Sequence, residues 1–446
     1  MEKIDQVKEL LEQRKYKEIR DLLTEENDAD VAVLLEELDT EDMIRVFRLL
    51  PKDSAADVFV YMSNESGREV IESLTNVEIG NIVNDLYSDD VIDMLEELPA
   101  NVVKRVLAAS DAETRRDINH LLKYPEDSAG SHMNVEFVDL RAEMTVSDAI
   151  SRIREIGVDK ETINTCYVMD KSRHMLGVIT LRKLLLSGSN ELIGDIMNDN
   201  VISVHTLTDQ EEVALEFQKY DLTVMPVVDN ENRLVGIITV DDVVDIMLEE
   251  TTEDIEKMAA ITPGDKPYIK TGPFETYKKR IPWLLILMIS ASITGKIIQG
   301  YEHALASYVI LTSFIPMLMD TGGNSGSQAS VSVIRAISLN EIKLSDTWKI
   351  VWKELRVSIL VGGTLAVANF AKVLIIDQTT VEVALVICST LWFTVIIAKL
   401  VGCLLPIIAN KIGFDPAIMA SPFITTIVDA LSLVVYFTIA AAILGI

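Results

Sequence analysis

The residue whose position says most about the chemistry of this chain is Asp429, a carboxylate inside the apolar run 422–437. With its flanking residues the run reaches about 20 apolar or weakly polar positions, enough to cross a bilayer as a helix. A carboxylate at mid-span costs about 2.5–3.5 kcal/mol even on insertion scales. Asp429 is therefore expected to face a bundle interior or a water-filled path, where its negative charge would attract a metal cation.

Two hydroxyl residues share the helical face of Asp429. Thr425 precedes it by four positions and Ser421 precedes Thr425 by four, so the three form one polar stripe on an apolar helix. Small and hydroxyl residues also hold membrane helices together, and helix packing is the alternative explanation for Ser421 and Thr425. The carboxylate on the same stripe favours a conduction path.

The elements that would position this stripe are five membrane-spanning helices, predicted from apolar runs near 283–300, 305–336, 355–376, 381–408 and 416–446. Lys and Arg cluster at 278–280, at 335–356 and at 411, whereas the connections near 300–303 and 377–382 have none. Because positive loops stay in the cytoplasm, the N-terminal part is expected inside and the C-terminus outside the plasma membrane. The second run contains the polar segment 320–328, which fits backbone that is buried or lines a cavity.

Charge divides the chain of 446 residues into two parts. Residues 1–270 hold 59 acidic and 28 basic side chains, a balance of −31, whereas residues 271–446 hold 10 and 12, a balance of +2. An acidic soluble part of this size argues against nucleic acid and favours cations or basic partners. The N-terminal segment 1–20 is charged and is not expected to be a signal peptide. Three cysteines without paired spacing argue against a disulfide framework or a zinc site.

The soluble part reads as two kinds of domain. Residues 1–132 contain short amphipathic helices and predict an all-α superhelical N domain in which stacked helices share one core. Residues 133–250 contain a duplication, because segment 170–180 matches segment 229–239 at an offset of 59 residues. Each copy predicts two strands, with an amphipathic helix upstream at 146–156 or 210–220. The duplication resembles an α/β tandem CBS pair, with CBS 1 at 133–197 and CBS 2 at 198–250; another duplicated α/β module is the alternative.

CBS pairs often bind adenine nucleotides, and in many of them a Thr followed three residues later by Asp holds the ribose. The second repeat has this pattern at Thr239 and Asp242, whereas the first has Thr180 and Lys183. Lys183 is suited to a phosphate but not to the ribose contact. The resemblance therefore raises ATP binding at the CBS pair without deciding it.

Acidic motifs recur in both soluble domains. Asp89 and Asp93 in the helical domain are four residues apart, as are Asp241 and Asp245 in the second repeat, so each pair shares a helical face. Aspartates in a first helical turn are also favourable without any ligand, which is the alternative for either motif alone. Their recurrence favours cation sites, and carboxylates select hard divalent ions.

The order of parts, with Thr321–Gln328, the Phe414-Asp415-Pro416-Ala417 motif and Asp429, resembles the MgtE family of magnesium channels over essentially the whole chain. The resemblance implies a Mg²⁺-selective homodimer with a linking helix region at 251–280 and a five-helix transmembrane domain at 281–446. It implies pore metal binding by Asp429, with Asn324, Ser421 and Thr425 lining the path. It also implies that cytosolic Mg²⁺ closes the pore by binding regulatory acidic residues: Asp89, Asp93, Glu211, Asp221, Asp242, Asp245, Glu250, Glu253, Asp254 and Asp415.

Three other functions fit parts of the sequence. An ion-coupled secondary transporter would use Asp429 as a proton carrier. An intramembrane aspartic protease would use the Asp320-Thr-Gly tripeptide with Asp429 as a carboxylate dyad, although the tripeptide lies between apolar helical runs. A receptor would need the spans only as an anchor, for which five spans with a buried carboxylate are excessive.

Overall fold

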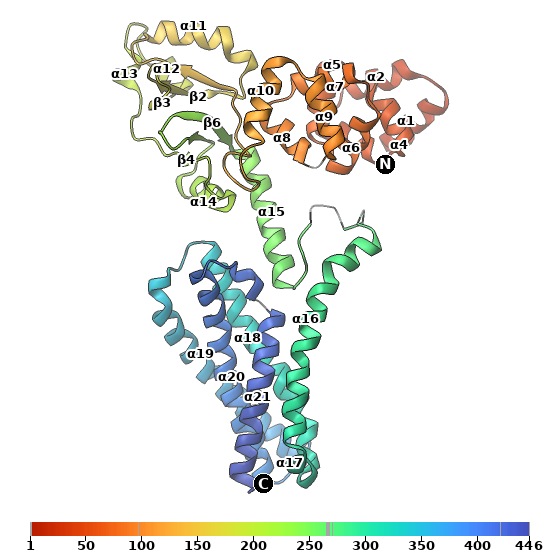
Figure 1. Cartoon of the computed structure of the whole chain (residues 1–446), viewed down its shortest axis with the longest axis vertical. Coiled ribbons are helices and arrows are strands. Elements are labelled where there is room, and N and C mark those ends of the chain that lie inside the picture. The colour runs from red at the N-terminus through yellow and green to blue at the C-terminus, as the bar shows by residue number, and fades with distance from the viewer. Residues whose placement is uncertain (1, 97, 265–267, 270, 420, 446) are drawn as a thin grey trace. The chain divides into compact units, whose positions relative to one another are not determined.

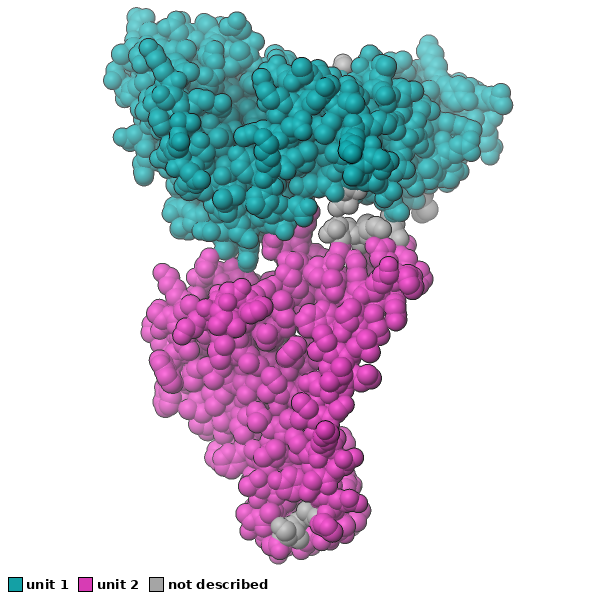
Figure 2. Space-filling view, viewed as in Figure 1, with its two compact units in different colours: residues 1–247 teal, residues 248–446 magenta. Residues whose placement is uncertain are grey.

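A computed structural model describes residues 2–96, 98–264, 268–269, 271–419 and 421–445 (Figure 1). The chain divides into two compact units, residues 1–247 and residues 248–446 (Figure 2). Each unit has its own buried core, and each is described by itself below.

The N-terminal part of the first unit is all-α. Its helices pack in two rows, because α3, α5, α7 and α9 contact in sequence, and so do α4, α6, α8 and α10. The described helices are α1 Glu2–Glu12, α2 Tyr16–Thr24, α3 Asp28–Glu36, α4 Thr40–Phe47, α5 Lys52–Val60, α6 Asn64–Ser73, α7 Asn76–Asp85, α8 Ser88–Glu96, α9 Ala100–Ala109 and α10 Ala112–Leu121. This confirms the helical N domain, whereas the superhelical winding of the rows remains a prediction.

Side-chain caps explain why so many short helices begin where they do. Thr75 and Glu78 form a reciprocal capping box at the start of α7, and Asp39 accepts a hydrogen bond from the backbone N–H of Asp42 at the start of α4. Such caps satisfy backbone donors that a helix start leaves unpaired, each contributing about 1 kcal/mol.

The duplicated region forms two three-stranded sheets with identical topology. In the first, β1 Phe137–Leu140 is parallel to β2 Thr162–Met169, which is antiparallel to β3 Met175–Thr180. In the second, β4 Val204–His205 pairs with β5 Val224–Val228 and β5 with β6 Leu234–Thr239 in the same way. The helices around the two sheets are α11 Val146–Ile156, α12 Leu181–Leu186, α13 Ile193–Ile196 and α14 Gln210–Tyr220.

The duplication and its offset of 59 residues are confirmed, because β3 and β6 begin and end exactly that far apart. The segment before the first repeat lies along the second one. The backbone N–H of Asn134 donates to the carbonyl of Ile237 at 2.7 Å, and the carbonyl of Asn134 accepts from Ile237 at 2.8 Å. This bridge brings the end of the helical domain next to β6.

The second unit is a bundle of long helices. It contains α16 Pro273–Gly300, α17 Glu302–Ser307, α18 Ile315–Ser338, α19 Thr347–Ile375, α20 Val381–Lys411 and α21 Ser421–Leu444. Helix α20 packs against α18, α19 and α21, and it carries many of the bundle's buried residues. Helix α15, Val240–Met258, runs from the first unit into the second.

Four described helical segments are long and apolar enough to cross a membrane: Pro273–Gly300, Leu344–Ile375, Val381–Lys411 and Pro416–Leu444. Helix α18, which carries the polar segment 320–328, is not among them. It is continuous through its glycines, and the irregular backbone lies before it, in the 3-10 turn Val309–Phe314. The glycines therefore do not break the helix.

Candidate functional site

The contact between α18 and α21 is the structural basis of the predicted path. A Cβ added at Gly323 would lie 2.9 Å from Cγ2 and 3.3 Å from Oγ1 of Thr425, and one at Gly326 would lie 2.7 Å from Ile424. Contacts this short leave no room for a side chain, so glycine is what allows the two helices to approach. Thr425 therefore lies beside Gly323, immediately before the predicted pore residue Asn324.

Asp429 lies one helical turn beyond Thr425 on α21. Its Oδ1 atom is buried and has no hydrogen-bond partner among the described residues. Asn324 is exposed on the surface of the single chain. The side chain of Ser421 lies outside the part that the structure describes. The sequence thus located the two described polar residues of α21 correctly on one face, and α18 supplies the opposite wall.

A second polar cluster joins the end of α15 to the connection between α20 and α21. The ammonium Nζ of Lys257 lies 2.7 Å from Oδ2 of Asp415 and 2.7 Å from Oε1 of Glu253. Ser338 on α18 donates to Oδ2 of Asp254 at 3.3 Å. Three predicted regulatory residues, Glu253, Asp254 and Asp415, are therefore brought to one region of the second unit.

Lys257 is the functional residue here that the sequence analysis missed. Its spacing of four residues from Glu253 was a signal for an ion pair on a helix. Burial acts to lower the pKa of Lys257, but hydrogen bonds to Asp415 and Glu253 outweigh burial and raise it. Burial and then the nearby charge of Asp415 raise the pKa of Asp254. A fixed ammonium therefore already neutralises part of this acidic set.

A third cluster lies in the first unit, where the helical domain meets the duplicated region. The fully buried Asn134 donates its Nδ2 to both carboxylate oxygens of Asp89 at 3.1 Å and to Oε2 of Glu161 at 3.1 Å. Nearby, the hydroxyl of Ser88 donates to Oε2 of Glu136 at 2.7 Å. Two carboxylates from distant parts of the chain thus share one amide.

Burial and mutual repulsion raise the pKa values of this cluster. Burial, followed by the charge of Asp242, raises the pKa of Asp89 well above its usual range. The same two causes raise the pKa of Asp90 to about 7, and burial with the charges of Asp241 and Asp242 raises that of Glu161 to about 7. The sequence predicted Asp89 and Asp242 but missed Asp90 and Glu161, because nothing in their spacing reports a neighbour so distant in sequence.

The other predicted regulatory residues are less concentrated. Asp93 lies near Asp90, on which its charge acts. Glu211 and Asp221 lie at opposite ends of α14, about 15 Å apart along its axis. Asp245 and Glu250 lie along α15. Within the described residues, no three His, Cys, Asp or Glu side chains form a ready-made metal site.

The predicted nucleotide residues do not form one site. In the second repeat, Thr239 donates its hydroxyl to Oδ2 of Asp242 at 2.6 Å, so the pair caps α15. In the first repeat, the side chain of Lys183 is exposed, while its backbone N–H donates to Oγ1 of Thr180 at 3.2 Å.

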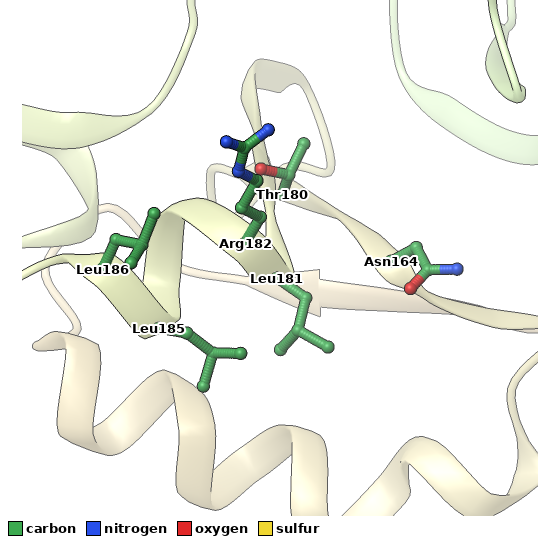
Figure 3. Close-up of a pocket in the computed structure, with 6 residues that line it drawn as sticks. All are labelled: Asn164, Thr180, Leu181, Arg182, Leu185 and Leu186. Atoms are coloured by element: carbon green, nitrogen blue, oxygen red, sulfur yellow. The ribbon is translucent and has the colours of Figure 1, made fainter.

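A pocket of about 570 Å³ lies on this helix, lined by Asn164, Thr180, Leu181, Arg182, Leu185 and Leu186. Thr180 and Arg182 point to one side of α12 and Leu181 and Leu185 to the other (Figure 3). The size is that of a small-molecule site. Arg182, rather than Lys183, is the basic side chain that lines it.

Apolar helices with a polar line leading to an unpartnered carboxylate, joined to an acidic soluble part, define a membrane transport protein for cations. The magnesium transporter MgtE of Thermus thermophilus is 37% identical over 366 residues, which cover 80% of this chain and 79% of that protein. The chain belongs to the MgtE family.

Further comparisons agree with this assignment. Family models match residues 315–439 (divalent cation transporter), 26–127 (MgtE intracellular N domain) and 193–249 (CBS domain). The magnesium transporter MgtE of Bacillus subtilis is 37% identical over 80% of this chain and 78% of that protein. A solved structure of the cytosolic domain of the Mg²⁺ channel MgtE in complex with ATP is 38% identical and covers 55% of this chain and 99% of that one, with a TM-score of 0.53. The predicted family, N domain, CBS pair and helical membrane region are thereby confirmed.

Proposed function

We propose that this chain is a Mg²⁺-selective channel for magnesium uptake that cytosolic Mg²⁺ closes. The observation that carries the proposal is the buried, unpartnered Oδ1 of Asp429 on the α18–α21 contact. An oxygen ligand in a polar path suits a hard divalent cation, and Mg²⁺ releases its water reluctantly, so Asp429 binds the hydrated ion through its waters. The family relatives, which are named magnesium transporters, support this cation.

The pore needs α18 as a fifth span beside the four apolar ones. Asn324 is exposed on the single chain, and an amide at membrane depth is costly in lipid, so this face of α18 meets water or a second copy. A homodimer with α18 and α21 along its axis satisfies both conditions. In this arrangement the acidic domains are cytoplasmic, the C-terminus is outside and the membrane is the plasma membrane.

Gating follows from the two acidic clusters. Without cations, the charges around Asp89 and Asp242 repel one another and favour separation of the helical domain from the CBS pair. Hydrated Mg²⁺ held between such carboxylates binds the compact state better and shifts the equilibrium toward it. Helix α15 carries Asp242 near one end and Lys257 near the other, so it transmits the change to Asp415 beside the pore helices.

Adenine nucleotide at the CBS pair is a second proposed ligand. The pocket on α12 offers the Arg182 side chain for a phosphate and apolar side chains for a base. Equilibrium dialysis with radiolabelled ATP would test it, with Arg182→Ala expected to weaken binding and Lys183→Ala to leave it unchanged.

The experiment for the channel is Mg²⁺ flux in proteoliposomes. Asp429→Ala is expected to abolish flux, whereas Asp377→Asn, which removes a carboxylate paired with Lys372 at 2.9 Å, leaves flux unchanged. Equal flux in wild type and Asp429→Ala would refute the pore assignment. A flux that depends on a proton gradient would favour the secondary transporter instead. The protease alternative is not supported, because Asp320-Thr-Gly lies within helix α18.

A further inference from the structure

Helix α18 carries a second carboxylate whose position the proposed function leaves unexplained. Asp320, Asn324 and Gln328 follow one another at intervals of four residues, so they share one helical face, and all three are exposed on the single chain. A carboxylate and two amides on one face of a membrane helix are too costly to meet lipid. This face therefore borders the aqueous path.

The register between α18 and α21 brings Asp320 to the level of Asp429. A Cβ at Gly326 would meet Ile424, one at Gly323 would meet Thr425, and one at Gly322 would lie 3.2 Å from Oγ of Ser432. Contact positions thus move backward along α18 as they move forward along α21, so the helices are antiparallel. One turn from Gly323 is Asp320, and one turn from Thr425 is Asp429. The charge of Asp320 accordingly acts on Asp429.

Unsatisfied polar atoms at the same level point to a missing ligand. Oδ1 of Asp429 is buried without a partner, and so is the hydroxyl of Thr394 on α20, which is fully buried, among the described residues. Thr394 belongs to this level because its Cγ2 would lie 2.8 Å from a Cβ at Gly322. Buried polar groups normally find a partner in the protein, in water or in an ion.

We infer that Asp320 and Asp429 of one chain together form the pore's divalent-cation site, with Asp320 as the residue that determines divalent over monovalent selectivity. This inference rests on the proposed channel function. Two carboxylates match the charge of one hydrated divalent ion, whereas a single carboxylate holds a monovalent ion nearly as well. Removing one unit charge from a hydrated site of this kind is expected to weaken divalent binding about tenfold.

The test is Mg²⁺ block of monovalent current through the full-length channel. In divalent-free solution the wild type is expected to carry Na⁺ current that Mg²⁺ blocks. Asp320→Asn should raise the half-blocking Mg²⁺ concentration about tenfold and should raise the permeability of Na⁺ relative to Mg²⁺. Asp320→Glu keeps the charge and should retain the block, and Asp377→Asn controls for loss of a carboxylate elsewhere in the bundle.

A chemical version separates charge from folding. The native cysteines Cys166, Cys388 and Cys403 are all buried, so a thiol introduced by Asp320→Cys is the accessible target for sulfonatoethyl or trimethylammonioethyl methanethiosulfonate. The anionic reagent should restore Mg²⁺ block within the same protein sample, and the cationic reagent should not. This comparison remains decisive even where Asp320→Asn is poorly expressed, because both reagents act on one folded variant.

The outcomes distinguish the inference from the proposed function. A wild type without Mg²⁺ flux would overturn both. A wild type that conducts Mg²⁺, with the same block in Asp320→Asn and no difference between the two reagents, would overturn the role of Asp320 alone. A tenfold change that the anionic reagent reverses would support it.

Discussion

The ammonium of Lys257, near the end of α15, lies 2.7 Å from the carboxylate of Asp415, in the connection that precedes α21. Asp415 also accepts a hydrogen bond from the backbone N–H of Ala417 at 2.7 Å, which holds its carboxylate at the start of the following turn. A tethered cation thus occupies part of a region predicted for Mg²⁺. The linking helix is therefore attached to the pore helices even before Mg²⁺ binds.

Lys257→Gln is expected to loosen this attachment. Without the ammonium, Glu253 and Asp415 lose the cation between them, and closure comes to depend on Mg²⁺. Flux at low internal Mg²⁺ should rise about threefold, and the fold inhibition by Mg²⁺ should increase, because a partly exposed ion pair contributes modestly. Proteoliposome flux against internal Mg²⁺ measures both. Lys349→Gln, which removes the exposed pair with Asp346 at 2.7 Å, is the control; an identical effect there would contradict the assignment.

The acidic cluster of the first unit predicts a pH dependence. Asp90 and Glu161 have pKa values raised to about 7 from ordinary values of 3.8 and 4.5. Because the folded state holds these protons more tightly than the unfolded chain, their stabilisation is full below the ordinary values and is lost as the pH rises through 7. Mg²⁺ should replace the lost protons, so its increase in melting temperature should be larger near pH 8 than near pH 6.

The matched test of that pH dependence is the double variant Asp90→Asn and Glu161→Gln. Both changes keep side-chain size and remove the titration, so the melting temperature should become less dependent on pH and on Mg²⁺. Differential scanning fluorimetry of the full chain in detergent measures this. A variant that keeps the wild-type pH dependence would show that other groups titrate.

Asn134 is predicted to hold the acidic cluster together. Its amide donates to Asp89 and Glu161, so Asn134→Ala leaves a buried carboxylate without its donor, at a cost of about 1–3 kcal/mol. Asn134→Asp should destabilise more at neutral pH, because it adds a third charge, and Mg²⁺ should recover part of the loss. Thermal unfolding measures both changes. Asn200→Ala, at an exposed position, should leave stability nearly unchanged.

The contact between α18 and α20 depends on Gly402. A Cβ there would press against the backbone carbonyl of Gly326, with the carbonyl carbon 3.0 Å away. Backbone cannot move aside as a side-chain tip can, so Gly402→Ala is expected to destabilise the bundle by about 1–3 kcal/mol or more. Gly363→Ala on α19, where a Cβ meets nothing within 4 Å, is the matched control. Melting temperature and monodispersity in detergent compare them; equal stability would show that the helices can separate at Gly402 without cost.

Local patterns determined much of this protein in advance. The period of apolar residues located the long helices, and helices 146–156 and 210–220 occur at the predicted residues. The offset of 59 residues identified the duplicated sheets, and a carboxylate at mid-span marked Asp429. These features could be read from the sequence because each depends on neighbours within a few turns of one helix or strand, or on the repetition of a segment.

Only the tertiary structure decided which distant residues meet. The Asn134 amide joins Asp89 to Glu161 across 72 residues of chain, and Lys257 meets Asp415 across 158. The glycines of α18 were predicted to mark irregular backbone, but the helix is continuous, and three of them instead let α21 approach closely enough to bring Asp320 level with Asp429. Such pairings depend on the packing register of two elements, and register is set by the fit of whole surfaces, which no spacing within a single segment records.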